Sequence, residues 1–329
     1  MPHSFSCERI LATVDWAHAE LREQGRFSGY AMDSLLACVD KETSRPGLFA
    51  RYLRGENSPS RKMLNNLAYR HGSSAVERMD LPLYEVLRRG HANFLTLDPF
   101  DKQLLDIETR LNFRLKRYLG EMTYATVEPT RARALTLASY GDSTALAALL
   151  MWAPSKQIED PEESTGDPTD CLVIGQRAYQ CLILSMANGE FPQTGPVLAA
   201  RIRQQVLDSL SAGDRRLDTA SIDIEAAVSA GRCLLEQASK RTTLAKKRRI
   251  LRIALAGHFS GHVDTMTPKI VLAEEADQAR RKHPVKLAFG AVPMSKANLV
   301  SGYGSNARNH LRAAMGDYLE SVPATDDQY

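Results

Sequence analysis

The chain is poor in the residues that mark disulfide-stapled and metal-bound proteins. Its 329 residues include five cysteines, which lie far apart and form no Cys-x-x-Cys pair. An odd count spread over a long chain argues against a disulfide framework or a zinc knuckle and fits reduced thiols in a cytoplasm. Aromatic residues make up only 7% of the sequence, which leaves few rings for the base-stacking platforms of single-strand binding.

Long hydrophobic runs are also missing. The N-terminal stretch has no apolar segment typical of a signal peptide, and the longest near-apolar run, residues 145–153, is too short to cross a bilayer. We therefore predict a cytoplasmic protein without a membrane partner. With 43% hydrophobic and 25% charged residues, the composition is that of a globular protein, and the length allows about two domains.

Apolar residues at helical spacing are abundant. Ile10, Val14, Ala17 and Leu21 form one stripe. The same spacing recurs over residues 104–118, 197–210, 222–238 and 244–256. Gly25, Gly55, Gly72, Gly90, Gly120 and Gly141 punctuate these segments and are expected to end helices.

Strand patterns are scarce, the best candidates being residues 134–139 and 286–292. We therefore predict a mainly α fold in two parts. Residues 1–96 would form a helix-turn-helix-like domain and residues 97–329 a larger helical domain. An acidic, proline-rich and mobile loop is expected within the larger domain at residues 154–170.

Charge is segregated along the chain although the net charge is only +3. Basic residues dominate residues 45–71 and 240–252, whereas acids dominate residues 155–170. A charge run is ordinarily a solvated face, so these runs need a structural context before they indicate a partner.

The stretch RPGLFARYLRGENSPSRKMLNNLAYRH predicts two short helices that meet at a tight corner. Pro46 can begin the first helix and Gly55 can end it. Ser58 or Ser60 can cap the second helix. Basic side chains would stand on the outside of this corner.

The segment ARYLRGENSPSRKMLNNLA resembles the Cro/C1-type (XRE-like) helix-turn-helix family in a degenerate form. The likeness is confined to the N-terminal region, and the preceding turn, DKETSRP, is longer than that of the family. The resemblance implies that residues 44–53 enter a major groove of double-stranded DNA. The residues that it implies for DNA contact are Thr43, Ser44, Arg45, Arg51, Arg54, Asn57, Ser60, Arg61 and Lys62.

A second basic segment, KRTTLAKKRRILR, predicts a helix with one apolar face. It offers a possible second nucleic-acid patch, and the alternative is a solvated face. The residues of this patch are Lys246, Lys247, Arg248 and Arg249.

Signals for enzymes and cofactors are weak. His258 and His262 have metal-ligand spacing, but the glutamate of the HExxH motif is missing. The glycines at 302–304 begin too near the chain end for a dinucleotide fold. Ser143 follows a possible strand in the sequence GDSTA, which is the setting of a nucleophile elbow. We expect no metal and no cofactor.

The sequence therefore predicts a non-enzymatic DNA-binding protein, a transcriptional regulator that acts as a homodimer on double-stranded DNA. Two alternatives remain open. The N-terminal fold could be a repurposed module that binds a protein partner, or the chain could be a serine hydrolase that uses Ser143 with His258 or His262.

Overall fold

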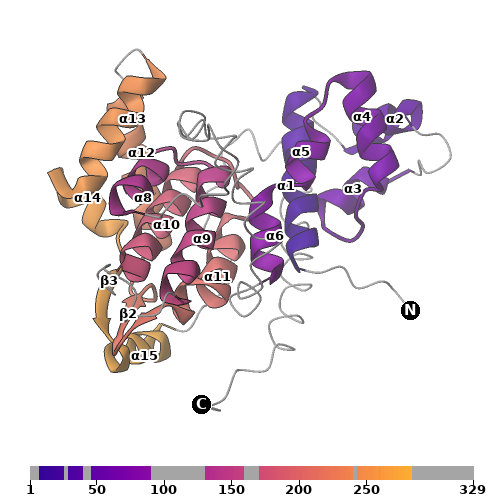
Figure 1. The fold of residues 1–329 in the computed structure, drawn as a ribbon. Coiled ribbons are helices and arrows are strands. Elements are labelled where there is room, and N and C mark those ends of the chain that lie inside the picture. Colours follow the sequence, from indigo (N-terminus) through magenta and orange to yellow (C-terminus); the bar gives the residue numbers. More distant parts are fainter. Residues whose placement is uncertain are drawn as a thin grey trace, which may run out of the picture. The chain divides into compact units, whose positions relative to one another are not determined.

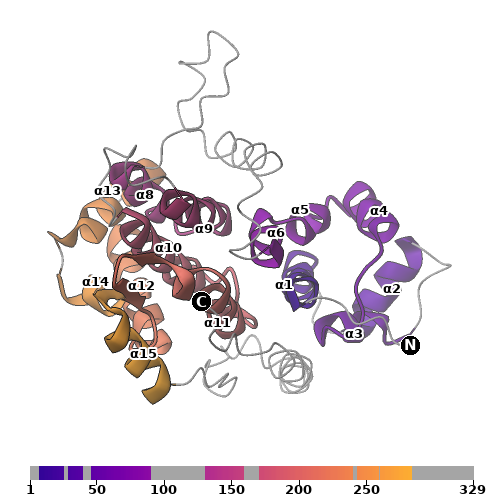
Figure 2. The ribbon, with the colours of Figure 1, turned by 60° about the horizontal axis from the view of Figure 1, so that its bottom comes forward.

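The computed structural model describes residues 7–25, 29–39, 46–89, 130–158, 170–239, 243–258 and 260–283 (Figures 1 and 2). These residues are mostly helical, so the prediction of a mainly α fold is confirmed. They fall into two compact units, the first ending at Tyr84 and the second beginning at Glu85. The predicted boundary at 96–97 lies outside the described residues.

The first unit consists of short helices around one long helix (Figure 1). Their bounds are α1 (Cys7–Glu23), α2 (Gly29–Val39), α3 (Leu48–Leu53), α4 (Arg61–His71), α5 (Ala75–Met79) and α6 (Pro82–Arg89), and the division between the units falls within α6.

Helix α1 contributes many of the buried side chains in the core of the first unit. Val14, Ala17 and Leu21 of the predicted stripe are buried. Trp16 on the same helix is fully buried and forms edge-to-face pairs with two rings of α3, with centroid distances of 5.8 Å to Phe49 and 5.5 Å to Tyr52. Edge-to-face pairs of this kind add about 0.5–1.5 kcal/mol each to the burial of the rings. The aromatic side of α3 is therefore committed to the core.

Gly55 ends α3 at a close approach to α1. Its φ of 70° is left-handed, as predicted for a helix-ending glycine. A Cβ at this position would lie 2.7 Å from Cγ2 of Ile10. Gly72 ends α4 in the same conformation, with φ 63°. Gly55 thus serves both the backbone turn and the close approach of two helices.

The second unit is built around two buried helices, α9 and α10. The bounds of its elements are α8 (Arg131–Ala138), α9 (Ser143–Ile158), α10 (Asp170–Ala187), α11 (Gly195–Gln205), the 3-10 turn η3 (Leu207–Ser209), β1 (Ser211–Ala212), β2 (Arg215–Asp218), α12 (Ile224–Ser239), α13 (Leu244–Ile253), the π-type turn η4 (Ala254–His258), α14 (Ser260–Thr265), β3 (Lys269–Leu272) and α15 (Ala273–Lys282).

Helix α10 is the central element of this unit and packs against α9, α12 and α8 (Figure 2). Its residues 178–186 are all buried, and so are residues 145–154 of α9. Two helices that are apolar on nearly every side explain why the sequence shows no narrow stripe here. Among the described helices, none combines the length and the apolar character that crossing a bilayer requires.

Several sequence predictions in this unit are wrong in detail. Residues 134–139 are not a strand, because α8 runs over Arg131–Ala138 and buries Ala134, Leu137 and Ala138 at helical spacing. Helix α9 continues through Pro154 to Ile158, and α10 begins at Asp170. Residues 154–158 and 170 of the predicted acidic loop are therefore helical, and its remaining residues, 159–169, lie outside the described residues. The segments 104–118 and 286–292 also lie outside them.

The second unit contains a small antiparallel sheet that the sequence did not predict. Strand β2 pairs with β1 on one side and with β3 on the other, in the order β1-β2-β3. Arg216 and Val271 are partners in the longer ladder, as are Leu217 and Ile270. The strands are two to four residues long, too short for alternation to be visible in the sequence.

Candidate nucleic-acid interface

Helix α3, the element expected to enter a major groove, is short and largely packed. Four of its six residues are buried, namely Phe49, Ala50, Tyr52 and Leu53. Arg51 is exposed and is the only cation within the helix. The outward face of α3 therefore offers a single guanidinium.

Asp33 of α2 fixes the beginning of α3. Its two carboxylate oxygens accept hydrogen bonds from the backbone N–H groups of Gly47 and Phe49, both at 2.7 Å. The N-terminal amides of a helix have no partner within the helix, and the helix dipole favours an anion there. The Asp33 carboxylate therefore ties α2 to the beginning of α3.

The corner between α3 and α4 is held by α1. The Arg9 guanidinium donates to the Ser58 hydroxyl at 2.5 Å and to the Pro59 carbonyl at 3.0 Å. The Thr13 hydroxyl lies 3.1 Å from the same Ser58 oxygen. Burial lowers the pKa of Arg9, an effect that the charge of Asp80 opposes. The corner is thus a rigid part of the unit.

Ser60 caps α4, as predicted for Ser58 or Ser60. Its hydroxyl oxygen accepts a hydrogen bond of 3.2 Å from the Met63 amide. The hydroxyl hydrogen is left to donate outward. Asn57, which precedes this cap, is half-buried.

Two of the predicted phosphate contacts are ion-paired inside the unit. Arg54 lies 2.7 Å from Glu56, and Arg61 pairs with Asp80. The pair of Arg61 is largely exposed, and exposed pairs contribute only about 0–1 kcal/mol, so a phosphate can displace the carboxylate. Arg54 is more buried and better held.

The remaining predicted contacts divide into two groups. Lys62, in the first turn of α4, is exposed, as is Arg51. Thr43, Ser44 and Arg45 lie outside the described residues. The structure therefore brings part of the predicted set onto α3 and the beginning of α4.

Two exposed tyrosines on this unit were missed by the sequence reading. Tyr30 of α2 is 78% exposed and Tyr69 of α4 is 91% exposed. Tyr69 follows Arg61 and Asn65 at intervals of four residues, so the three share the outward stripe of α4. The phase of the buried residues Met63, Leu64 and Leu67 is the signal that could have placed Tyr69 outside.

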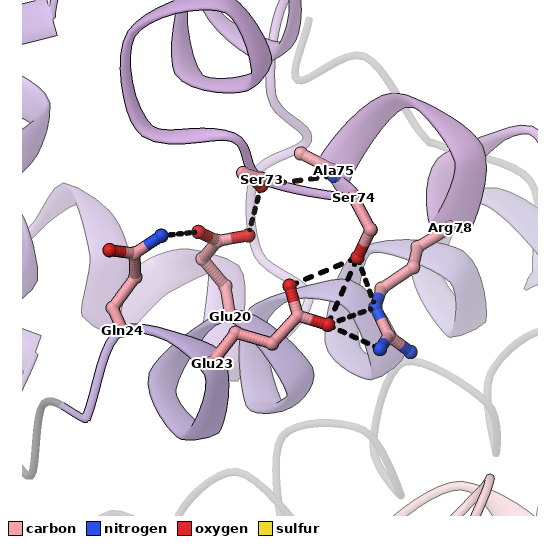
Figure 3. Close-up of polar contacts among 7 residues, drawn as sticks. All are labelled: Glu20, Glu23, Gln24, Ser73, Ser74, Ala75 and Arg78. Carbon is pink, nitrogen blue, oxygen red and sulfur yellow. Dashed lines mark hydrogen bonds and ion pairs between the residues drawn. The ribbon is translucent and has the colours of Figure 1, made fainter.

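The last turn of α1 is tied to α5 by two carboxylates (Figure 3). Glu20 accepts hydrogen bonds from the Ser73 hydroxyl at 2.6 Å and from Gln24 at 2.9 Å. Glu23 accepts from Ser74 and pairs with Arg78. Partial burial opposes ionisation of Glu23, but the hydrogen bonds from Arg78 and Ser74 lower its pKa. This cluster holds α1 against α5 through hydrogen bonds and one ion pair.

The second predicted patch lies on α13. Lys246 and Arg249 are exposed, and Lys247 and Arg248 are half-buried. The guanidinium carbon of Arg248 stands 3.7 Å from the ring centroid of Tyr140. One helix thus carries all four predicted cations, on two of its sides.

The alternative of a nucleophile elbow at Ser143 does not match the structure. The preceding segment is helix α8 rather than a strand. The Asp142 carboxylate accepts from the Ala145 amide at 2.8 Å and so caps α9. The Ser143 amide donates to Glu190 at 2.8 Å. This is a helix-to-helix turn, and the serine hydrolase alternative loses the geometry that motivated it.

His262 lies exposed on α14, and His258 ends the preceding turn. The described part of the chain contains no group of three or more side chains able to hold a metal ion.

Comparisons with protein-family models, with curated proteins and with solved structures found no match to this chain.

Proposed function

We propose that this protein binds double-stranded DNA through α2, α3 and α4 of its first unit and acts as a homodimeric transcriptional regulator. The observation that carries the proposal is the arrangement around α3. Asp33 anchors its beginning, Arg9 and Thr13 brace the corner that follows it, and Arg51 projects from it. A rigidly held helix that presents a cation is what groove reading requires.

The beginning of α4 adds a site for a phosphate. The first amides of this 11-residue helix have no partner within the helix, and the Ser60 hydroxyl and Lys62 stand beside them. In the proposed complex Arg51 contacts a base edge or a phosphate inside the groove. Ser60, Arg61 and Lys62 contact the backbone at its margin and fix the register.

The number of cations argues for two copies on DNA. A handful of phosphate contacts from one monomer gives non-specific binding with a Kd of about 10⁻⁴ to 10⁻⁶ M. Sequence-specific regulators commonly place two copies on half-sites about 34 Å apart. We therefore propose a homodimer. Selection of binding sequences from a random duplex library should return inverted half-sites, and sedimentation of the complex should give two chains per duplex.

Binding of a fluorescent random duplex by the full chain, measured against salt, tests the interface. Arg51→Ala should weaken binding severalfold and make the slope of log K against log salt shallower by about 1. Arg22→Ala is the matched control. Arg22 is exposed in the last turn of α1, about 18 Å along that helix from Ile10, which touches Gly55.

The control should leave both affinity and slope unchanged. Binding that does not depend on salt, or an equal loss in both variants, would contradict the proposed interface.

A second candidate is a module that binds a protein partner. The exposed Tyr30 and Tyr69 favour it, since tyrosine is enriched at interface hot spots. Tyr69→Ser should then abolish co-purification of a stoichiometric protein partner and leave duplex binding unaltered. Loss of duplex binding in the same variant would instead place Tyr69 within the DNA interface.

A further inference from the structure

Helix α13 carries an excess of positive charge. Its ten residues, LAKKRRILRI, contain five cations and no acid. In the first unit Arg54, Arg61 and Arg78 each have a carboxylate partner. Within the described ranges no ion pair involves a cation of α13, and neither acid of the adjacent α12, Glu225 or Glu236, reaches it.

The cations of α13 differ in their exposure to solvent. Lys246, Arg249 and Arg252 are exposed, and at 100° per residue they fall within an arc of about 120°. They follow one another at intervals of three residues, or about 4.5 Å along the axis. The outward face therefore carries a row of three charges over roughly two turns.

The opposite side of α13 is fastened to the unit. Leu251 is buried, and the Arg248 guanidinium stacks on the ring of Tyr140, which follows α8. The Thr243 hydroxyl caps the helix by accepting from the Lys246 amide at 3.3 Å. A helix held at its cap, its middle and its buried face keeps the row of cations in fixed order, which lowers the entropy lost on binding.

We infer that the outward face of α13 is a second surface for the phosphate backbone of duplex DNA, apart from the interface on α3 and α4. Charge complementarity selects the partner, since three cations in a row that no acid of the described residues neutralises fit a polyanion. Cations in a row contact phosphates rather than base edges, so this surface adds affinity that does not depend on the DNA sequence.

An anionic membrane is the less suitable polyanion. A helix that lies on a bilayer buries an apolar face in it. In α13 the apolar residue Leu251 faces the protein, and the exposed apolar residues, Leu244 at 61% and Ile253 at 39%, stand at opposite ends of the helix. They are separated by the cations and form no continuous stripe.

The inference shares its ligand, duplex DNA, with the proposed function but concerns a different surface. An experiment can therefore disprove one of them without disproving the other. The full chain is titrated with a fluorescent random duplex over a range of salt concentrations. The variant Lys246→Gln/Arg249→Gln/Arg252→Gln removes the outward row and spares Arg248. The control Lys269→Gln/Arg281→Gln/Lys282→Gln removes the same charge from exposed positions of β3 and α15 in the same unit.

The α13 variant should bind roughly tenfold more weakly at low salt, with a slope shallower by about 2 to 3, because each lost phosphate contact removes about 0.9. The control should bind as the unaltered chain does. The charge-conserving variant Lys246→Arg/Arg249→Lys/Arg252→Lys should retain binding, and circular dichroism should show all three variants folded.

Equal losses in the α13 variant and the control would overturn the inference, because net charge alone would then account for binding. An unchanged α13 variant would overturn it too, while a loss in Arg51→Ala would still support the interface on α3. Binding to vesicles of phosphatidylcholine and phosphatidylserine that falls in the α13 variant, with duplex binding intact, would overturn it in favour of a membrane surface.

Discussion

The carboxylate of Asp33 and the backbone amide of Phe49 form a 2.7 Å hydrogen bond that joins α2 to α3. The same carboxylate accepts from Gly47 at 2.7 Å. A side chain on α2 thus serves as the cap that α3 lacks in its own N-terminal residues.

Replacing Asp33 with alanine should therefore destabilise the first unit and misplace α3. The loss of two hydrogen bonds to a charged acceptor is expected to cost about 2–4 kcal/mol, and duplex binding should fall with it. The measurement is urea unfolding of the full chain, together with the duplex titration. Ser34→Ala, one position along on the exposed side of α2, is the control and should change neither. A fully stable Asp33→Ala protein would show that α3 does not depend on this cap.

Replacing Gly55 with alanine should lower the free energy of unfolding more than replacing Gly47, although both residues are left-handed, with φ of 70° and 78°. A Cβ at Gly47 meets open space, so Gly47→Ala costs only backbone strain, about 1 kcal/mol. A Cβ at Gly55 would lie 2.7 Å from Ile10, and the cost of moving α3 away from α1 adds to that strain. Urea unfolding should show the larger loss for Gly55→Ala. Equal losses would contradict the close approach of α1 and α3.

Helical content was predictable because periodicity records burial on one side. The stripe of α1 could be read directly, and Gly55 and Gly72 were placed correctly as helix ends. Residues 134–139 were predicted to be a strand because a run of six small or apolar residues fits both the helical and the strand period, and only packing against α9 and α10 decides between them. The sheet could not be foreseen, since β2 and β3 pair across more than 50 residues of sequence.

The candidate interface was predictable in composition but not in contacts. The sequence marked Arg54 and Arg61 as cations, yet their partners Glu56 and Asp80 depend on where the chain folds back. The role of Asp33 was invisible for the same reason, because nothing in a sequence says that a carboxylate in one helix will cap another. Charge can be counted in a sequence, whereas its neutralisation depends on the fold.

His18 should make the first unit sensitive to mild acid. Burial, helped by the charge of Arg22, lowers its pKa from 6.5 to about 4. Below pH 6.5 the unfolded chain takes up a proton that the folded chain refuses, so stability is fully present above that pH and falls as the pH drops toward 4. The loss amounts to about 3–3.5 kcal/mol at most. The free energy of unfolding, measured with urea between pH 7 and 4, should fall with decreasing pH, and His18→Gln should make this fall smaller. An equal fall in both proteins would contradict the prediction.

The five cysteines should differ sharply in reactivity toward a thiol reagent. Cys38 on α2 is exposed and should react fast, and Cys233 is half-buried and should follow. Cys7, Cys171 and Cys181 are buried. Burial, reinforced by the charges of nearby acids, also raises the pKa of Cys181, which removes the reactive thiolate as well as access. Titration with a chromogenic disulfide should therefore show one thiol that reacts fast, one that reacts at an intermediate rate, and three that react only in denaturant. Cys38→Ser should remove the fast phase alone, whereas fast reaction of more than two thiols in the folded chain would show that the helical cores open readily.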